Sequence, residues 1–311
     1  MSRPDPPIVN LADLEPAHIE AGHLNADWTF VGRALGCANV GVRRIQVRPG
    51  FFSTPLHVHA HDEETFYVLG GSGLSVQDDR TYVVRPGDCV VHREAAEAHT
   101  LKAGDDGLDV IVFGHSRERS SGARLPRIGM TWSARSWFPT GEGPSPFERE
   151  AALGPPDTPE PAERPASIVN VDESTPMTSE RDGYRGTHRG LGGPARARRT
   201  GLNHVALETG QMAWPPHCHS ADEEVFVVLD GEGTLLLGDD EHPVRPLDVV
   251  SRPPATSVAH AFRAGDDGLI YLAYGTQEPN DICYYPRSNK IAFWGVGVIG
   301  RIEPLDYWDG E

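Results

Sequence analysis

Apolar and polar residues alternate along most of this chain in short stretches that are separated by turn residues. One stretch runs from Val40 to Val47 and is followed by the turn Arg48-Pro49-Gly50, and a hairpin is expected at Gly70–Gly73. Alternation with a period of two residues is typical of strands with one buried face. The stretches are short and frequent, and almost none has a helical period. The pattern therefore predicts an all-β fold, either a closed antiparallel barrel or a jelly roll.

The pattern occurs twice along the chain. Residues 8–11 (IVNL) return as residues 168–171 (IVNV), and residues 103–114 (AGDDGLDVIVFG) return as residues 264–275 (AGDDGLIYLAYG). These matches indicate that one unit is duplicated. A length of 311 residues agrees with two domains. We therefore expect two tandem barrels related by internal duplication.

A segment between the two halves differs from both in composition. Residues 145–167 are rich in proline and acidic residues, which favours an extended linker or a strap over the surface. Residues 130–138 and the chain end, residues 280–311, are rich in aromatic residues. Both are too apolar to be free, so each is expected to pack on its own barrel or on the other one. The expected units are an N-terminal barrel at 1–125, a tryptophan-containing strap with the linker at 126–166, and a C-terminal barrel with an aromatic tail at 167–311.

Charge and composition exclude several kinds of partner. The formal net charge is −17, from 28 basic and 45 acidic residues, and such a surface repels nucleic acid and anionic membranes. The sequence has neither an apolar run long enough to span a membrane nor an apolar signal segment at its start, so we expect a cytoplasmic protein. A small-molecule substrate is the expected partner. The sequence leaves open whether the chain forms a homodimer.

The segment HVHAHDEETFYVLGG, residues 57–71, carries side chains that are suited to metal binding. Side chains alternate along a strand, so His57 and His59 point to the same face. Glu64 can add an oxygen from the next strand, and His99 can complete the set from a later one. Three nitrogens and one oxygen suit Mn, Fe, Co, Ni or Zn, and an octahedral site leaves two positions open.

The same arrangement returns in HCHSADEEVFVVLDG, residues 217–231, with His260 as the distant histidine. Two ligands do not make a site, but a set of four that occurs twice indicates metal binding. The preceding glutamate, Glu63 or Glu223, competes for the oxygen ligand, although strand parity favours the second glutamate of each pair. We expect one divalent transition metal (Fe, Mn, Ni or Zn) in each barrel. The predicted ligands are His57, His59, Glu64, His99, His217, His219, Glu224 and His260.

These motifs resemble those of the cupin superfamily. Its first motif, a glycine, His-x-His, a glutamate and a second glycine, is found in residues 50–71 and again in residues 210–231. Its second motif, a Pro-Gly-Asp turn, a strand and a histidine, matches residues 85–99. In residues 245–260 Leu247 replaces the turn glycine, and neither copy has the asparagine that usually follows the histidine. The resemblance implies a bicupin with two tandem cupin-type β-barrels (double-stranded β-helix or jelly roll).

The resemblance implies a range of activities rather than one. Bicupins include dioxygenases, decarboxylases, isomerases, lyases and hydrolases, together with storage proteins that often lack the metal ligands. Our leading hypothesis is a metal-dependent, dioxygenase-like oxidoreductase that acts on a small organic molecule. The second is a non-redox isomerase, lyase or decarboxylase that uses the metal as a Lewis acid. The third is a metal-containing binding protein without turnover. No motif identifies the catalytic residues.

The surroundings of the two motifs differ, which predicts unequal barrels. Arg44 lies on the polar face of its strand and would offer a cation to a substrate carboxylate if that face looks into the barrel. A solvent-facing Arg44 agrees equally well with the alternation. Trp214 would stack on a substrate or pack in the core. The residues before His99 are charged (REAAEA), whereas those before His260 are apolar (RPPATSVA). We expect one catalytic barrel and one mainly structural metal site.

Overall fold

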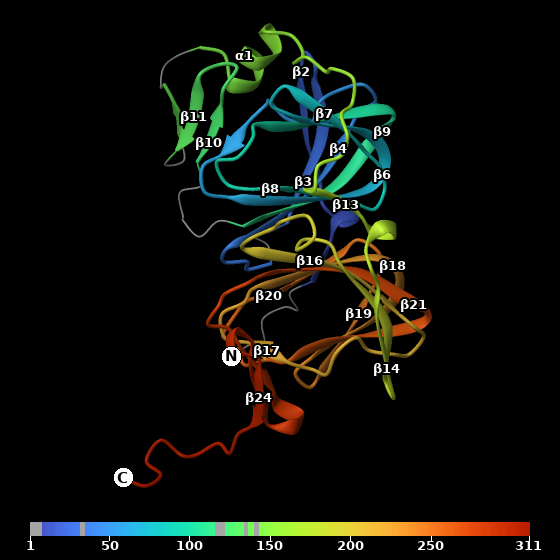
Figure 1. The fold of residues 1–311 in the computed structure, drawn as a ribbon, viewed down its shortest axis with the longest axis vertical. Helices are drawn as coiled ribbons and strands as arrows, with labels where there is room; N and C mark the ends of the chain where they lie inside the picture. The colour runs from blue at the N-terminus through green and yellow to red at the C-terminus, as the bar shows by residue number, and fades with distance from the viewer. Residues whose placement is uncertain (1–7, 32–34, 116–121, 134–135, 140–142) are drawn as a thin grey trace.

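The computed structural model describes residues 8–31, 35–115, 122–133, 136–139 and 143–311. The start of the chain, residues 1–7, on which the expectation of no signal segment rests, lies outside the described residues. Within them the chain is almost entirely β, with two eight-stranded and two four-stranded antiparallel sheets. Figure 1 shows the two barrels stacked along the long axis, with the first half of the chain above the second. The prediction of an all-β fold with two barrels is confirmed.

The large sheets of the two barrels have the same strand order. The first runs β13 (Ile168–Asn170), β8 (Asp88–His92), β6 (Glu63–Gln77), β9 (His99–His115), β4 (Val40–Val47), β3 (Leu24–Phe30) and β2 (Ala17–Ala21), with β7 (Arg80–Val84) paired to β6. The second runs β1 (Ile8–Asn10), β20 (Asp248–Arg252), β18 (Glu224–Leu237), β21 (His260–Thr276), β16 (Thr200–Leu207), β15 (Tyr184–Gly190) and β14 (Met177–Arg181), with β19 (Asp240–Val244) paired to β18. This correspondence agrees with an internal duplication.

The two IVN segments are exchanged between the barrels. β1, from the start of the chain, pairs with β20 of the second barrel, and β13 pairs with β8 of the first. Asn10 donates from Nδ2 to Asp248 Oδ1 at 2.8 Å, and Asn170 donates in the same way to Asp88 Oδ1 at 2.7 Å. Each barrel is therefore completed by a strand from the other half of the chain. The sequence repeat locates these strands but does not say which sheet they join.

Apolar clusters hold the structure together, and a small one around Phe52 lies in the first barrel beside three larger ones. Each barrel has its own interior cluster, around Phe66 in the first and around Phe226 in the second. A third cluster is formed by both halves, where the ring of Phe113 stacks on that of Tyr274 with centroids 4.6 Å apart. Val42 of β4 and its counterpart Leu202 of β16 pack in this shared cluster. Strands β4 and β16 thus present one face to their own barrel and the other to the neighbouring barrel.

The aromatic segments pack on their own barrels, next to the metal motifs. A four-stranded sheet joins β5 (Val58–His59), β10 (Ala123–Leu125), β11 (Met130–Ser133) and β12 (Ser136–Phe138). Its counterpart joins β17 (Cys218–His219), β22 (Ile282–Tyr285), β23 (Lys290–Phe293) and β24 (Val298–Arg301). The end of the chain differs from the expectation that it is packed, because Tyr307 is 86% and Trp308 71% exposed. This last segment projects from the second barrel (Figure 1).

The linker is not extended throughout. Residues Pro146–Ala152 form α1, which begins with a capping box between Ser145 and Glu148. Phe147 of this helix packs edge-on against Trp28, and the carboxylate of Glu150 is fully buried beside Arg127. The cap and these contacts explain why a short helix forms in an acidic, proline-rich segment. Short 3₁₀ turns at Leu11–Asp13, Val171–Glu173, Pro286–Ser288 and Trp294–Val296 complete the described structure. In the described part of the chain, no helix is both long and apolar enough to cross a membrane.

Candidate metal centres

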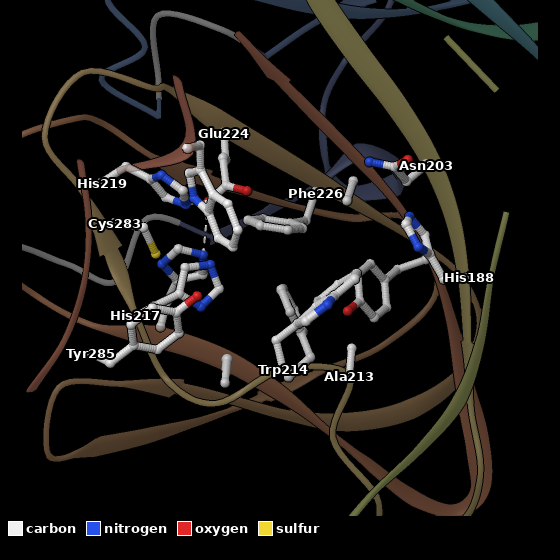
Figure 2. Close-up of a pocket in the computed structure, with 16 residues that line it drawn as sticks. His188, Asn203, Ala213, Trp214, His217, His219, Glu224, Phe226, Cys283 and Tyr285 are labelled. Carbon is white, nitrogen blue, oxygen red and sulfur yellow. Dashed lines mark ion pairs between the residues drawn. The ribbon is translucent and has the colours of Figure 1, made fainter. Parts of the chain in front are cut away.

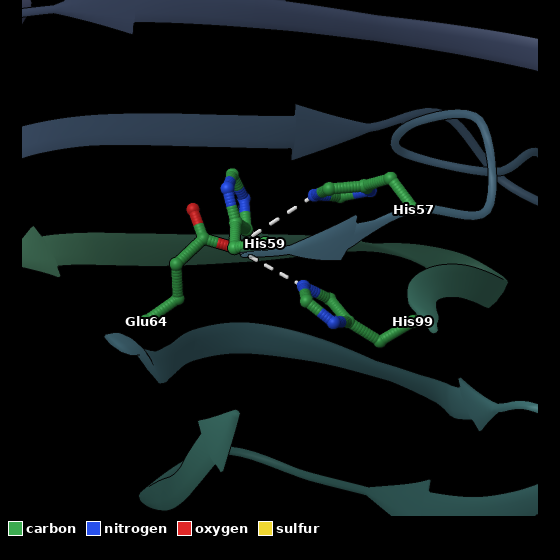
Figure 3. Close-up of side chains that lie close together, drawn as sticks. All are labelled: His57, His59, Glu64 and His99. Carbon is green, nitrogen blue, oxygen red and sulfur yellow. Dashed lines mark hydrogen bonds and ion pairs between the residues drawn. The ribbon is translucent and has the colours of Figure 1, made fainter. Parts of the chain in front are cut away.

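Three strands of the first barrel bring four predicted ligands together (Figure 3). His59 lies on β5, Glu64 at the start of β6 and His99 at the start of β9, while His57 exchanges two backbone hydrogen bonds with His99. A ligand atom from each of the four side chains lies within 4.8 Å of the others. The His-x-His spacing, the glutamate and the distant histidine thus form one cluster.

The charge distribution in the first centre is set by burial and by one arginine. Burial, together with neighbouring histidines, lowers the pKa of both His57 and His99 to about 4, so these imidazoles are neutral at pH 7. Glu64 places Oε2 3.1 Å from Nε2 of His59 and of His99. Burial would raise the pKa of Glu64, but the charges of His59 and Arg43 hold it well below its usual range. The carboxylate is therefore charged, with Arg43 Nη2 on its other oxygen.

The hydrogen bonds of these histidines leave ring nitrogens free to bind a metal ion. Nδ1 of His57 lies 2.9 Å from the Pro55 carbonyl oxygen, which can only accept, so Nδ1 carries the proton and Nε2 is left with a free lone pair. In the second barrel Nδ1 of His217 has the same relation to Pro215, also at 2.9 Å. Among the described residues, Nε2 of His59 is buried without a hydrogen bond of good geometry, and the acceptor beside it is the ligand carboxylate of Glu64. A divalent ion would satisfy Nε2 of His57 and of His59.

The second barrel repeats the centre in a more open form. Ligand atoms of His217, Glu224 and His260 lie within 4.8 Å of one another, and His219 forms a similar group with His217 and Cys283. Oε2 of Glu224 is 3.0 Å from Nε2 of His260 and 3.5 Å from Nε2 of His219. Glu224 is 21% exposed at its side chain, against 4% for its counterpart Glu64. Each barrel thus holds a His/Glu set that fits one divalent transition metal.

Cys283 is a neighbour of the second centre that the sequence did not single out. It lies on β22, which pairs with the strand that carries His219. Burial raises the pKa of its thiol to about 12. Cys283 is therefore a neutral thiol in the wall of the site.

Asp281 is a second residue of the site that the sequence analysis missed. Its Oδ2 lies 2.6 Å from Nδ1 of His219, and its Oδ1 accepts backbone hydrogen bonds from Ala221 and Asp222. Burial opposes a charge on His219, but the hydrogen bond to Asp281 and the charge of Glu224 raise its pKa to about 9. A carboxylate on the far nitrogen of a ligating histidine fixes the ring and raises its basicity. In the first barrel the corresponding nitrogen of His59 lies 3.5 Å from Asp62.

The competing glutamates have a different role. Glu63 accepts hydrogen bonds from Thr200 Oγ1 at 2.7 Å and from the backbone N–H of Arg198 at 2.8 Å. Glu223 accepts from the backbone N–H groups of Ala38 and Asn39, both at 2.7 Å. Both carboxylates therefore bind segments of the other barrel. This separation of adjacent side chains is what strand alternation demands.

The face of β4 that carries Arg44 does not look into its own barrel, which was the condition for the predicted substrate role. The Arg44 guanidinium forms two hydrogen bonds with Asp109, at 2.9 and 2.6 Å, on the face of β4 that looks toward the other barrel. The preceding residue, Arg43, points to the opposite face and contacts Glu64. The strand predicted to reach the first centre does reach it, but the arginine that contacts a ligand there is Arg43 and not Arg44.

Trp214 lies where its predicted role requires. It lines a cavity of about 250 Å³ whose wall also contains His217, Glu224 and His260. Figure 2 shows Trp214 across the cavity from the histidine cluster, with Ala213 beside it. His188 lies against Trp214, edge to face, with ring centroids 5.3 Å apart. The second centre therefore opens into a space that can hold a small molecule, and binding of a substrate by Trp214 stays a prediction.

Comparisons with known proteins show which domain family and which solved structures this chain is similar to. Residues 43–113 and 203–273 each match the Cupin domain family. Among solved structures the chain is similar to a deletion mutant of Bacillus subtilis oxalate decarboxylase, with 16% identity and a TM-score of 0.57 over 86% of this chain and 76% of that chain. It is also similar to Lactobacillus farciminis oxalate decarboxylase in complex with formate, with 15% identity and a TM-score of 0.60 over 87% of this chain and 86% of that chain.

A further similar structure is the Bacillus subtilis oxalate decarboxylase described with Mn(II) centres, at 16% identity, with a TM-score of 0.57 over 86% of this chain and 76% of that chain. No curated protein matches this sequence. Identities this low show a shared fold, and the two domain matches and the two His/Glu clusters agree with it. The chain belongs to the cupin superfamily as a bicupin, with two tandem cupin barrels that each carry a metal motif of three histidines and one glutamate.

Proposed function

We propose that this bicupin is a metal-dependent enzyme of the decarboxylase class that acts on a small carboxylic acid bound in the second barrel. The observation that carries the proposal is a ligand set that forms part of the wall of a substrate-sized cavity. The similar solved structures are oxalate decarboxylases, which supports the non-redox hypothesis over the dioxygenase-like one. The Mn(II) centres of the Bacillus subtilis enzyme make Mn(II) the first metal to test.

His217, His219, Glu224 and His260 would hold the metal. A divalent ion bound there supplies a Lewis acid, which polarises a substrate oxygen and stabilises negative charge that develops on it. In decarboxylation, the bond from the carboxyl carbon to the neighbouring carbon breaks and carbon dioxide leaves. The electron pair stays on the neighbouring carbon, which then takes up one proton. No oxidant is consumed.

The residues of the chain position the substrate and exclude water. Asp281 holds the ring of His219 through Nδ1, so that Nε2 faces Glu224 and the cavity. Phe226, Phe262 and Tyr271 form apolar wall, and their rings pack on one another with centroids 4.8 to 6.0 Å apart. A dry wall strengthens the electrostatic interactions of a bound carboxylate.

The test measures carbon dioxide release and oxygen uptake by protein loaded with Mn(II), with Fe(II) and Zn(II) in parallel, over a panel of small carboxylic acids. We expect carbon dioxide release without net oxygen consumption, and its loss in His260→Ala. Oxygen uptake in proportion to substrate loss would support the dioxygenase-like hypothesis instead. Saturable binding without either gas change would indicate a binding protein.

A further inference from the structure

The cavity of the second barrel is lined mainly by aromatic and small apolar side chains. Trp214, Phe226, Phe262 and Tyr271 account for much of its wall, with alanines between them. Its volume is about 250 Å³, and a dry apolar cavity of about 150 Å³ already admits benzene. The space therefore suits a six-membered ring with one or two substituents. A two-carbon acid would leave most of these aromatic surfaces without contact.

The charge of the site favours one carboxylate over two. None of the described residues that line the cavity is a lysine or an arginine. Arg252 interacts with Glu224 electrostatically, but its Nη2 donates to Thr256 and to the carbonyl of Val258, and it does not line the cavity. The charges of Glu224 and, behind His219, of Asp281 offset that of a divalent ion, so the site has no surplus positive charge for a second carboxylate. A second carboxylate in apolar surroundings would lack a partner, and burying such a charge is costly.

Two polar side chains lie across the cavity from the metal ligands. His188, on β15, and Asn203, on β16, both line the wall, and Figure 2 shows them on the side away from His217 and His219. Nε2 of His188 is buried and has no hydrogen-bond partner in the part of the chain that the structure describes. A buried polar atom without a partner costs free energy, so a ligand that reaches it gains by pairing with it. The far end of the cavity can therefore bind a hydroxyl or similar group.

We infer that the second barrel binds a ring-sized monocarboxylic acid, with the carboxylate on the metal, the ring between Trp214 and Phe226, and a polar substituent at His188 and Asn203. Oxalate, which has two charges and no ring, does not fit this description. The inference rests on the proposed function for turnover only. Binding itself can be measured whether or not the bound acid reacts.

The test is calorimetric titration of the Mn(II)-loaded protein with acetate, oxalate, benzoate and 4-hydroxybenzoate. We expect benzoate to bind about tenfold or more tightly than acetate, because the ring buries apolar surface. Binding of 4-hydroxybenzoate should be tighter again, by about fivefold, the value of one neutral hydrogen bond. Oxalate should bind more weakly than benzoate. Oxalate binding tighter than both ring acids would overturn the inference.

Two variants assign the affinity to named side chains. Trp214→Leu should weaken both ring acids about tenfold and leave acetate unchanged, while Trp132→Leu, a tryptophan beside the first barrel, should change none of them. His188→Leu should remove the advantage of 4-hydroxybenzoate over benzoate. Metal content and the melting temperature, measured for each variant, separate a local loss from misfolding. Ring acids that bind equally well to Trp214→Leu would contradict this placement.

The outcomes separate the inference from the proposed function. Ring acids that bind as described but release no carbon dioxide would leave the inference standing and the decarboxylase proposal without support. Carbon dioxide release from oxalate, with no binding of ring acids, would support the proposal and overturn the inference.

Discussion

The two barrels hold the same four ligand types but surround them differently. In the first barrel Arg43 contacts the ligand Glu64, whereas the matching position in the second barrel is Asn203, which lines the cavity. The buried Thr54 of the first barrel is replaced by Trp214 in the second. The ligands decide that a metal binds, and their neighbours decide what else can bind beside it. This difference supports the second barrel as the site of the proposed reaction.

A second contrast concerns what lies behind the distant histidine. His92 stacks on His99 in the first barrel, with centroids 3.8 Å apart and planes within 4°. The matching position in the second barrel is Arg252, whose Nη2 donates to Thr256 and to the carbonyl of Val258. In the first centre, a second imidazole thus stacks on the ligand His99, and an arginine contacts the ligand Glu64. Such a setting agrees with a mainly structural metal, as expected for one of the two barrels.

The largest effect on this comparison is expected from Asp281→Asn. Loss of the carboxylate behind His219 should weaken metal binding at the second centre by about 10- to 100-fold, because outer partners of ligating histidines contribute about that much. Asp62→Asn is the matched change in the first barrel. Because Asp62 Oδ2 is 3.5 Å from Nδ1 of His59, this change should weaken metal binding at the first centre less. Competition titration with a chelator measures both. Equal losses at the two centres would contradict the asymmetry.

The second largest effect is expected from substitutions that weaken the exchanged strands β1 and β13. Asn170→Ala and Asn10→Ala each leave a buried aspartate without one donor, so each should lower the free energy of unfolding by about 1–3 kcal/mol. The larger loss is expected for Asn170, which is 1% exposed against 6% for Asn10. Unfolding in urea measures the change, with the exposed Asn280→Ala as control. Unchanged stability in both variants would show that the exchanged strands do not hold the barrels together.

Much of the fold and of the metal centres could be predicted from the sequence because both depend on local spacing. Alternation predicted the strands, and the His-x-His motif followed by a glutamate located three ligands of each centre at once. The residues around the ligands were harder to find. Asp281, the residue before β22, contacts His219 from 62 residues later in the chain, without a motif of its own. Arg43 and Arg44 are adjacent, so choosing between them required the orientation of the strand.

The next effect is the pH dependence of stability in the metal-free protein, which should report on individual histidines and not on whole barrels, since the pKa of His217 in the second barrel is also lowered to about 4. The pKa of His57 and His99 is lowered to about 4 in the folded protein, from about 6.5 in the unfolded chain. The unfolded state therefore takes up protons first as the pH falls, and stability is lost between about pH 6.5 and 4.

His219 acts in the opposite direction in the second barrel. Its pKa is raised to about 9, so the stability that it contributes is complete below pH 6.5 and is lost as the pH rises through about 9. Melting temperatures of metal-free wild type, His57→Gln and His219→Gln from pH 5 to 9 should show a smaller acid loss in the first variant and a smaller alkaline loss in the second. Parallel curves for all three proteins would count against these assignments.

The smallest effect is expected from Arg44→Ala. Its ion pair with Asp109 is partly exposed, so its loss should cost about 1 kcal/mol or less in the free energy of unfolding. Metal content and ligand binding should not change, because the side chain faces away from the first centre. A loss of metal or of ligand affinity would contradict this placement of Arg44 and favour its predicted substrate role.

The central claim is that each barrel holds one metal through its own ligand set, and counting metals tests it most directly. Elemental analysis of purified, Mn(II)-loaded protein should give two metals per chain in the wild type. His99→Ala and His260→Ala should each give one, because each removes a ligand from only one centre. The two variants should also differ in ligand binding, with 4-hydroxybenzoate retained by His99→Ala and lost by His260→Ala. A wild type with one metal, whose content one of the two substitutions leaves unchanged, would contradict the claim.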